Sequence, residues 1–260
     1  MTEQNNNLGW LNLTSLAMPV KVLFTGYLMA IGVGLMMAGL QIMLTHGMAD
    51  GKFGLSVDDI VYSYYGNRSN SKLEAKLNGS MKDKAPPAER LEIIKWVHNG
   101  ATKEEWDAKI HGIMQKHCAM CHAHTPTLPN VAKYDEAKKL AEVDHGASIS
   151  QLTRVSHIHL FGISFIFMFV GFIFSFAVGF KWWVKVALIF TPFAFLVIDI
   201  ASWWLTKLNP GFAWFTIIGG LAYTAASTVM ILTSLWQMWI TPWKKGKVSC
   251  NAWSGECDKA

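Results

Sequence analysis

The sequence has few charged residues, and this scarcity excludes an average soluble protein. Only 16% of its 260 residues are charged and 52% are hydrophobic, whereas soluble domains carry about 25% charged residues. The apolar residues gather in four stretches long enough to cross a bilayer, at residues 20–45, 159–180, 184–205 and 212–240. We therefore expect an all-α integral membrane protein in which four transmembrane helices pack as an antiparallel bundle.

A surplus of basic residues away from the membrane boundaries is also missing, which excludes nucleic acid as a partner. The formal net charge is +5, but residues 46–156 hold 15 basic and 14 acidic residues. The remaining surplus lies at the ends of the apolar stretches, in Lys21, Lys181, Lys185, Lys244, Lys245 and Lys247. Because basic residues flank the cytoplasmic ends of spans, residues 46–156 are expected in the periplasm of a bacterium.

Neither an internal repeat nor a low-complexity run occurs, and the chain divides into four predicted parts. They are an N-terminal segment with the first span (1–45), a periplasmic domain inserted between spans one and two (46–156), spans two to four (157–240) and a cytoplasmic tail (241–260). We therefore expect a multi-pass protein of the bacterial inner membrane with both termini cytoplasmic. The tail contains no recognisable output domain, which argues against a sensor. We expect it to be poorly ordered, with Cys250 and Cys257 reduced.

Capping residues predict that the inserted domain is made of short helices. Ser56 with Asp59 begins the first, which Gly66 closes. Residues 73–79 form the second, and residues 133–143 form the last before the chain returns to the membrane.

Two further helices lie in the middle of this domain. The proline pair at residues 86–87 opens the first of them, which ends at Gly100. Its apolar face is predicted to carry Leu91, Ile94 and Val97. Thr102 and Glu105 form a capping box for the second. That helix places Trp106, Ile110, Ile113 and His117 along one stripe.

Cysteine is scarce as well, with four in the chain, and two of them stand in the run His117-Cys118-Ala119-Met120-Cys121-His122. The spacing Cys-x-x-Cys-His is the attachment pattern of a c-type haem. Two thiols one turn apart can form thioethers with both vinyl groups of one porphyrin, and the adjacent histidine then presents a ring nitrogen to the iron. The pattern therefore predicts one covalent haem c on Cys118 and Cys121, with His122 as the proximal ligand.

Two other kinds of site use the same cysteines. A zinc site would add ligands from His111, His117, His124 and His145, and a Cys-x-x-Cys pair alone can be a redox dithiol. Zinc sites of this kind normally show a second paired cluster. Cys250 and Cys257 lie more than a hundred residues away, so the haem interpretation is favoured over both.

With this motif the inserted domain resembles c-type cytochromes. In their common form a helix leads into Cys-x-x-Cys-His, a later loop supplies a Met as the second axial ligand, and a last helix packs on the first. After His122 this domain has no Met, and the next one is Met168 inside a span. Upstream, the run Asn78-Gly79-Ser80-Met81, followed by the proline pair and its helix, is similar to the Met loop and closing helix. The resemblance implies a permuted haem domain with Met81 as the distal ligand.

Other residues compete with Met81 for the distal position. A Met in a loop is usually an adaptable apolar filler. His145 is the main alternative, and His98, His111, His124 and Met48 come after it. The identity of the ligand matters because a His/Met pair raises the reduction potential relative to two histidines.

A polar group in hydrocarbon marks a second candidate site in the spans. Asp199 stands in an apolar run of the third span, about two turns from its periplasmic end. His46, His157 and His159 are expected near the same surface. The histidines could ligate a haem b, or an imidazole with Asp199 could accept the protons of a quinol. The third interpretation is ordinary hydrogen bonding between helices.

The resemblance to c-type cytochromes implies a membrane-bound protein that transfers single electrons at the periplasmic face. It would act as a subunit of a respiratory complex, with periplasmic or membrane redox proteins and the lipid bilayer as partners. Two alternatives remain at this stage. One is a quinol-oxidising subunit with a site or a haem b in the bundle, and the other is a docking subunit of a larger oxidoreductase.

Overall fold

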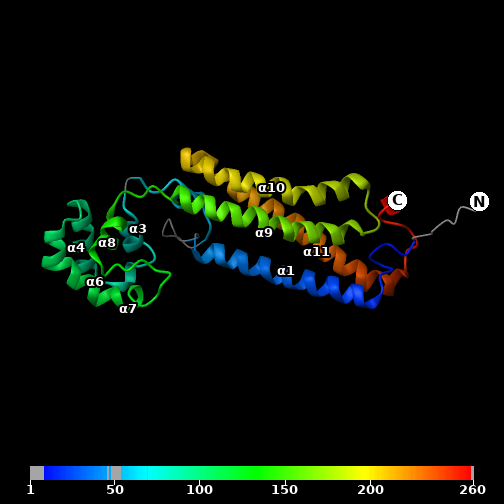
Figure 1. The fold of residues 1–260 in the computed structure, drawn as a ribbon, viewed down its shortest axis with the longest axis horizontal. Coiled ribbons are helices and arrows are strands. Elements are labelled where there is room, and N and C mark those ends of the chain that lie inside the picture. The colour runs from blue at the N-terminus through cyan, green and yellow to red at the C-terminus, as the bar shows by residue number, and fades with distance from the viewer. Residues whose placement is uncertain (1–8, 46, 48–53, 69, 259–260) are drawn as a thin grey trace, which may run out of the picture. The chain divides into compact units, whose positions relative to one another are not determined.

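The computed structural model describes residues 9–45, 47, 54–68 and 70–258, so His46 and Met48 lie outside the described residues. Four long helices run side by side as a bundle (Figure 1): α1 (Met18–Thr45), α9 (Ile149–Ser175), α10 (Trp182–Leu208) and α11 (Ala213–Lys245). All four are long and apolar enough to cross a membrane. The prediction of an all-α protein with four spans and a helical region between the first two is confirmed.

Short helices form the region between α1 and α9. In chain order they are α2 (Val57–Tyr64), α3 (Lys72–Asn78), η1 (Lys82–Lys84), α4 (Pro87–His98), α5 (Lys103–Glu105), the π-helical η2 (Trp106–Ile110), α6 (His111–His117), α7 (Ala119–His122) and α8 (Tyr134–Ala141). Two single-turn helices, η3 (Pro210–Phe212) and η4 (Glu256–Asp258), lie elsewhere in the chain. The chain divides into two compact units, one of residues 41–151 with 203–213 and one of the remaining residues.

The predicted capping box is complete at α2 and half formed at α5, where the Glu105 carboxylate accepts a hydrogen bond from the side-chain amide of Asn99. Ser56 and Asp59 form a complete capping box at the start of α2, and Gly66 follows that helix with a φ of +87°. The Thr102 hydroxyl accepts a hydrogen bond from the backbone N–H of Glu105 at the start of α5. These caps satisfy helix N–H groups that have no partner within the helix.

The second span begins earlier than its apolar stretch suggests. Helix α9 starts at Ile149, where the Ser148 hydroxyl accepts a hydrogen bond from the N–H of Gln151. His157 and His159 therefore lie in the third turn of the helix rather than at its first residues.

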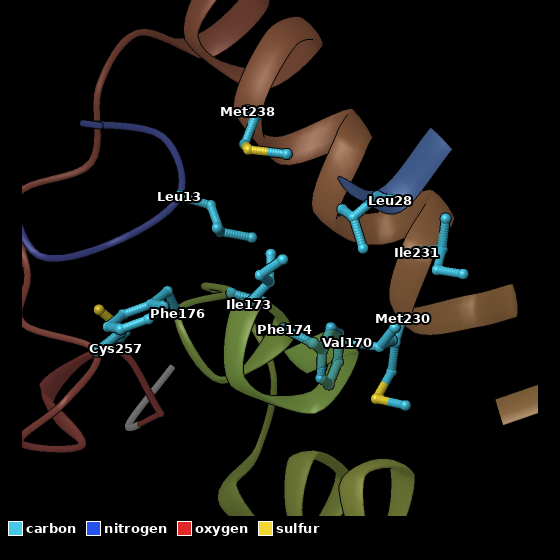
Figure 2. Close-up of a cluster of buried hydrophobic side chains, with 12 residues drawn as sticks. Leu13, Leu28, Val170, Ile173, Phe174, Phe176, Met230, Ile231, Met238 and Cys257 are labelled. Carbon is cyan, nitrogen blue, oxygen red and sulfur yellow. The ribbon is translucent and has the colours of Figure 1, made fainter. Parts of the chain in front are cut away.

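Apolar side chains from three spans fill the interior of the bundle (Figure 2). Val170 and Phe174 stand four residues apart on α9, so they project from one face. They pack in one cluster with Leu28 of α1 and Met230 of α11. Most other large apolar side chains of the spans are exposed on the outside of the bundle, as expected where lipid covers the surface.

The two ends of the chain are bound to each other at one end of this bundle. The N–H groups of Cys250 and Ala252 donate to the carbonyl oxygens of Gly9 and Leu11, at 3.1 and 3.0 Å. The amide of Asn12, which is fully buried, donates to the carbonyl oxygens of Gly9, Val248 and Cys250. We call residues 9–14 and 248–258 together the terminal clasp.

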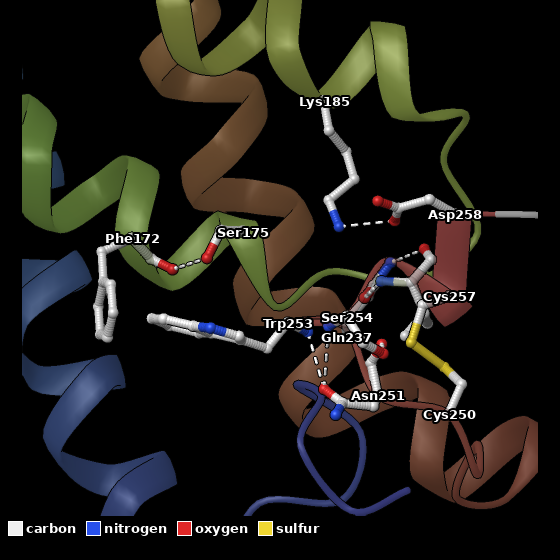
Figure 3. Close-up of polar contacts among 11 residues, drawn as sticks. Phe172, Ser175, Lys185, Gln237, Cys250, Asn251, Trp253, Ser254, Cys257 and Asp258 are labelled. Atoms are coloured by element: carbon white, nitrogen blue, oxygen red, sulfur yellow. Dashed lines mark hydrogen bonds and ion pairs between the residues drawn. A yellow bond between two sulfur atoms is a disulfide. The ribbon is translucent and has the colours of Figure 1, made fainter. Parts of the chain in front are cut away.

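The terminal clasp corrects the prediction of a poorly ordered, reduced tail. Cys250 and Cys257 form a disulfide (Figure 3), so the expectation that both stay reduced is wrong for this structure. Asp258 pairs with Lys185 at 2.7 Å, and both side chains are largely buried. The expectation rested on composition and compartment alone, whereas backbone pairing with the N-terminal segment orders the tail and brings the two cysteines together.

A separate core holds the helical region between α1 and α9. Ile93 and Trp96 of α4 are buried at 0% and 1% exposure, and Trp96 lies against Trp106 with ring centroids 5.3 Å apart. Of the predicted stripe, Trp106, Ile110 and Ile113 are confirmed as buried, whereas its fourth member, His117, is only partly buried. The predicted face of α4 is wrong in part. Leu91 is half exposed, because the helix turns Ile93 and Trp96 inward and leaves Ile94 and Val97 at the edge.

Truncating the central indole tests this core. Trp96→Ala should lower the free energy of unfolding of the helical region by about 3–5 kcal/mol, because it opens a cavity and removes the hydrogen bond from the indole N–H to the Thr102 carbonyl oxygen. Pulse proteolysis in urea of the full-length protein in detergent measures this change. Leu91→Ala is the matched control and should cost less than about 1 kcal/mol. Equal losses in the two variants would contradict the observed orientation of α4.

Candidate functional site

The Cys-x-x-Cys-His motif lies at the end of an almost continuous helical run, α5 through α7. Trp106 and Ile110 in the π-helical segment are buried at 2% and 3% exposure, and they anchor the run in the core. Single π turns often occur at functional sites. Cys118 is partly buried at the junction of α6 and α7, and Cys121 is exposed. The run is thus fixed at its start and presents its last turn at the surface.

The two thiols lie one turn apart and are both free. The N–H groups of Cys121 and His122 donate to the Cys118 carbonyl oxygen at 3.3 and 3.0 Å, which closes this turn. Two thioether bonds to one porphyrin need this spacing of two unpaired sulfurs on a short helical turn. The residues present therefore fit a covalently bound haem c.

The ring of His122 is fixed by a backbone carbonyl. Its Nδ1 lies 2.8 Å from the carbonyl oxygen of Pro129. Because a carbonyl oxygen only accepts, Nδ1 must carry the proton, and in the neutral ring Nε2 then keeps its lone pair. Metal-bound histidines almost always donate their other ring N–H in this way. His122 is therefore prepared to bind a metal through Nε2.

The thiol of Cys118 is poorly suited to a redox dithiol. Burial raises the pKa of this thiol above its ordinary value, whereas redox dithiols lower the pKa of the attacking cysteine. A thioether carries no charge and suits a partly buried sulfur.

The positions of the described side chains around the motif do not form the cluster of ligands that a zinc site needs. Within the part of the chain that the structure describes, no three His, Cys, Asp or Glu side chains come together closely enough to hold a metal ion. His111 lies near Gln115, and His117 pairs with Glu89. A haem iron needs only two axial ligands from the protein.

A surface hollow of about 510 Å³ lies between the proline loop and the helix that precedes the motif. Residues 82–87, Arg90 and His117 line it. Met81 lies directly before this lining and is 36% exposed, at the start of η1. The lining thus joins the segment that follows Met81 to His117, the residue before Cys118.

The other candidates for the distal ligand make contacts in different parts of the helical region. His145 lies in a loop whose neighbours are the Tyr64–Gly66 backbone and Lys207, which donates to the His145 carbonyl oxygen at 2.9 Å. His98 pairs with Glu74 at 2.9 Å. His124 lines a second hollow of about 300 Å³ together with His122. His124 is thus the rival that shares a hollow with His122, whereas the segment after Met81 lines the hollow beside His117.

Asp199 is buried at 5% exposure inside the bundle. The hydroxyl of Tyr223 on α11 hydrogen-bonds its carboxyl group. Gly219 packs directly against it, since a Cβ at that position would lie 2.9 Å from the Asp199 Cβ. One turn further along α10, Ser202 and Thr216 bond to each other at 2.5 Å. Asp199 therefore belongs to a polar contact between α10 and α11.

The histidines predicted near Asp199 are placed on α9. The ring of His157 lies 5.1 Å from that of Phe161, and its side chain is exposed. His159 donates from Nδ1 to the Val155 carbonyl oxygen at 2.9 Å. Since the two residues are two positions apart, they face different sides of the helix. His46 is outside the described residues.

Three residues that contact the candidate side chains were not predicted from the sequence. One is Pro129, whose carbonyl oxygen accepts a hydrogen bond from the His122 ring. Glu89 and Tyr223 act through contacts with residues 28 and 24 positions away. Nothing in the local pattern points to these partners, because the packing of helices decides them.

The contact of Glu89 with Lys116 and His117 makes the stability of the helical region depend on pH. The Lys116 ammonium, which donates a hydrogen bond to Glu89, holds the pKa of this carboxyl below its ordinary value, and His117 acts in the same direction. The charged carboxylate therefore stabilises the fold above pH 4.5, the ordinary value, and this contribution is lost as pH falls through the lowered pKa. Glu89→Gln should reduce stability at pH 7, and its difference from the wild type should vanish in acid.

Urea unfolding of the helical region at pH 7 and pH 3, followed by proteolysis, measures this difference. Glu142→Gln at the end of α8 is the control, because this carboxylate is exposed. The assignment fails if Glu89→Gln and Glu142→Gln have the same pH dependence.

The comparisons with known proteins concern the bundle. Residues 133–246 match a family model, Aq_1264_TM, which is described as a transmembrane helical domain. The match includes α9, α10 and α11 and lies after the cysteine motif. The comparison with curated proteins finds no match, and that with solved structures finds none either. This part of the chain is therefore similar to a transmembrane helical domain, in agreement with the three long apolar helices that it contains.

Proposed function

We propose that this protein is a membrane-anchored c-type cytochrome that transfers single electrons. Cys118 and Cys121 would hold one haem c covalently, with His122 as the proximal ligand and Met81 as the distal ligand. The observation that carries the proposal is the hydrogen bond from His122 Nδ1 to Pro129, which leaves Nε2 as the ligand atom in a Cys-x-x-Cys-His turn with two free thiols.

The haem iron would supply reversible one-electron chemistry when bound. The residues of the chain would hold this group and tune its ligands. The carbonyl oxygen of Pro129 orients the His122 ring and would strengthen it as a ligand by accepting a hydrogen bond from Nδ1–H. Met81 would raise the reduction potential relative to a second histidine.

The distribution of lysines supports a periplasmic position for this site. Lys181 and Lys185 flank the turn between α9 and α10, and Lys244 and Lys245 end α11. These ends belong in the cytoplasm by the positive-inside rule, so the region between α1 and α9 would lie on the opposite side. Its partners would be periplasmic or membrane redox proteins, and the four helices would hold the protein at the bacterial inner membrane within a respiratory complex.

Haem attachment is the first test of the proposal. Pyridine haemochrome analysis of the purified full-length protein should give about one covalent haem c per chain, the number that one motif holds. Cys118→Ala with Cys121→Ala should abolish it. Cys250→Ala with Cys257→Ala is the matched control and should retain it. Wild-type protein without covalent haem would overturn the proposal.

The distal ligand is tested separately. Met81→His should lower the midpoint potential of the haem, because two histidines stabilise the oxidised iron relative to a His/Met pair. A redox titration measures the potential, and the charge-transfer absorption of the sulfur–iron bond should disappear at the same time. His145→Ala is the control and should leave both unchanged. The opposite pattern would assign the position to His145.

A further inference from the structure

Three basic side chains gather at the C-terminal end of α10, and we call Arg68, Lys72 and Lys207 the basic cluster. Lys207 lies in the last turn of α10, Arg68 lies in the turn before α3, and Lys72 is the first residue of α3. The Arg68 guanidinium donates to the carbonyl oxygen of Lys207 at 3.5 Å, across 139 positions of the chain. The positive charges of Arg68 and Lys72 are close enough to repel the Lys207 ammonium. All three residues belong to one compact unit, so the fold of that unit brings the charges together.

The basic cluster carries more positive than negative charge. Lys72 forms an ion pair with the Asp144 carboxylate at 3.3 Å. Among the described residues, Asp144 is the one acidic side chain whose charge acts on Lys207. The Lys207 ammonium donates to the carbonyl oxygen of His145 at 2.9 Å, and the hydrogen bond of Arg68 also goes to a carbonyl oxygen. Two positive charges therefore have neutral oxygens as their partners, where an anion would bind more strongly.

Helix capping explains only part of this arrangement. The C-terminal end of a helix leaves carbonyl oxygens unpaired and carries partial negative charge, which attracts cations. Arg68 meets that need with one hydrogen bond, but a guanidinium has five N–H donors. The guanidinium is exposed and lies 3.8 Å from the centre of the Tyr65 ring, which restricts its position. Because arginine binds phosphate through two parallel hydrogen bonds, the basic cluster has donors to spare for an anion with several oxygens.

Exposed apolar side chains adjoin the basic cluster on the same helix. Leu205 and Leu208, in the last turn of α10, are 40% and 79% exposed. Helix α10 is long and apolar enough to cross a membrane, so its last turn belongs where hydrocarbon meets the lipid headgroups. An anion bound by Lys207 at this level could carry acyl chains that cover the two leucines. A free inorganic anion would make no use of this apolar surface.

We infer that the basic cluster binds the phosphate group of an anionic phospholipid, whose acyl chains lie along the last turn of α10. Basic residues beside a span attract anionic lipids. A zwitterionic phospholipid carries its own ammonium group next to the phosphate, and the uncompensated charges of Arg68 and Lys207 would repel it. This site is distinct from the Cys-x-x-Cys-His motif and does not depend on the proposed function.

The test compares two lipids that have the same acyl chains, so that a difference in affinity reports the headgroup. The purified full-length protein in a nonionic detergent is titrated with dioleoyl phosphatidylglycerol or dioleoyl phosphatidylcholine, and native mass spectrometry measures the bound lipid. The wild type should bind phosphatidylglycerol severalfold more tightly, and sodium chloride should reduce the difference by screening. Equal affinities for the two lipids would overturn the inference without the use of any variant.

Variants of the basic cluster locate the binding. Arg68→Gln with Lys207→Gln should weaken phosphatidylglycerol binding about tenfold, because two charges near the headgroup are lost. Arg68→Lys with Lys207→Arg keeps both charges and should retain most of the affinity. Lys133→Gln with Lys139→Gln is the matched control, since it removes the same charge from exposed lysines at α8, and it should bind like the wild type.

The outcomes also separate lipid binding from helix capping. If the cations only cap α10, Arg68→Gln with Lys207→Gln lowers the thermal midpoint but leaves the affinity for phosphatidylglycerol at the wild-type value, and the inference fails. Gel filtration checks that each variant folds. If this double variant does not fold, the comparison of the two lipids on the wild type decides.

Inorganic phosphate distinguishes a lipid site from a site for a free anion. Sodium phosphate should displace phosphatidylglycerol no better than sodium chloride at the same ionic strength, because the acyl chains contribute to lipid binding. Displacement by phosphate but not by chloride would assign the basic cluster to free phosphate and overturn the inference.

Discussion

Hydrocarbon cannot form hydrogen bonds, and this constraint determines both halves of the chain. In the spans every backbone N–H and C=O must pair internally, which only long helices achieve here. Polar side chains within the bundle must then bond each other or the backbone. Asp199 bonds Tyr223, and the Gln237 amide bonds both the N–H and the carbonyl oxygen of Val178. The exceptions among described residues of the four long helices are the hydroxyls of Thr206, Ser227 and Ser234.

Local signals in the sequence predicted much of this structure, and tertiary contacts account for what was missed. The four spans follow from apolar length, and the caps at Ser56 and Thr102 follow from side chains that bond neighbouring backbone. The orientation of α4 was missed because burial of Trp96 depends on Trp106, on another helix. The disulfide of Cys250 and Cys257 was missed because its tail is held by residues near the other end of the chain. That disulfide favours an oxidising compartment, whereas the lysines favour the cytoplasm for the same end.

The terminal clasp has a consequence for the order of biosynthesis. Asn12 bonds the carbonyl oxygen of Val248, 236 positions later, so this contact cannot form until the fourth helix has left the ribosome and entered the membrane. Until then two of the three carbonyl acceptors of the Asn12 amide do not exist. The N-terminal segment must therefore wait at the membrane surface through the whole of synthesis, and its closure marks a chain that has been inserted to the last span.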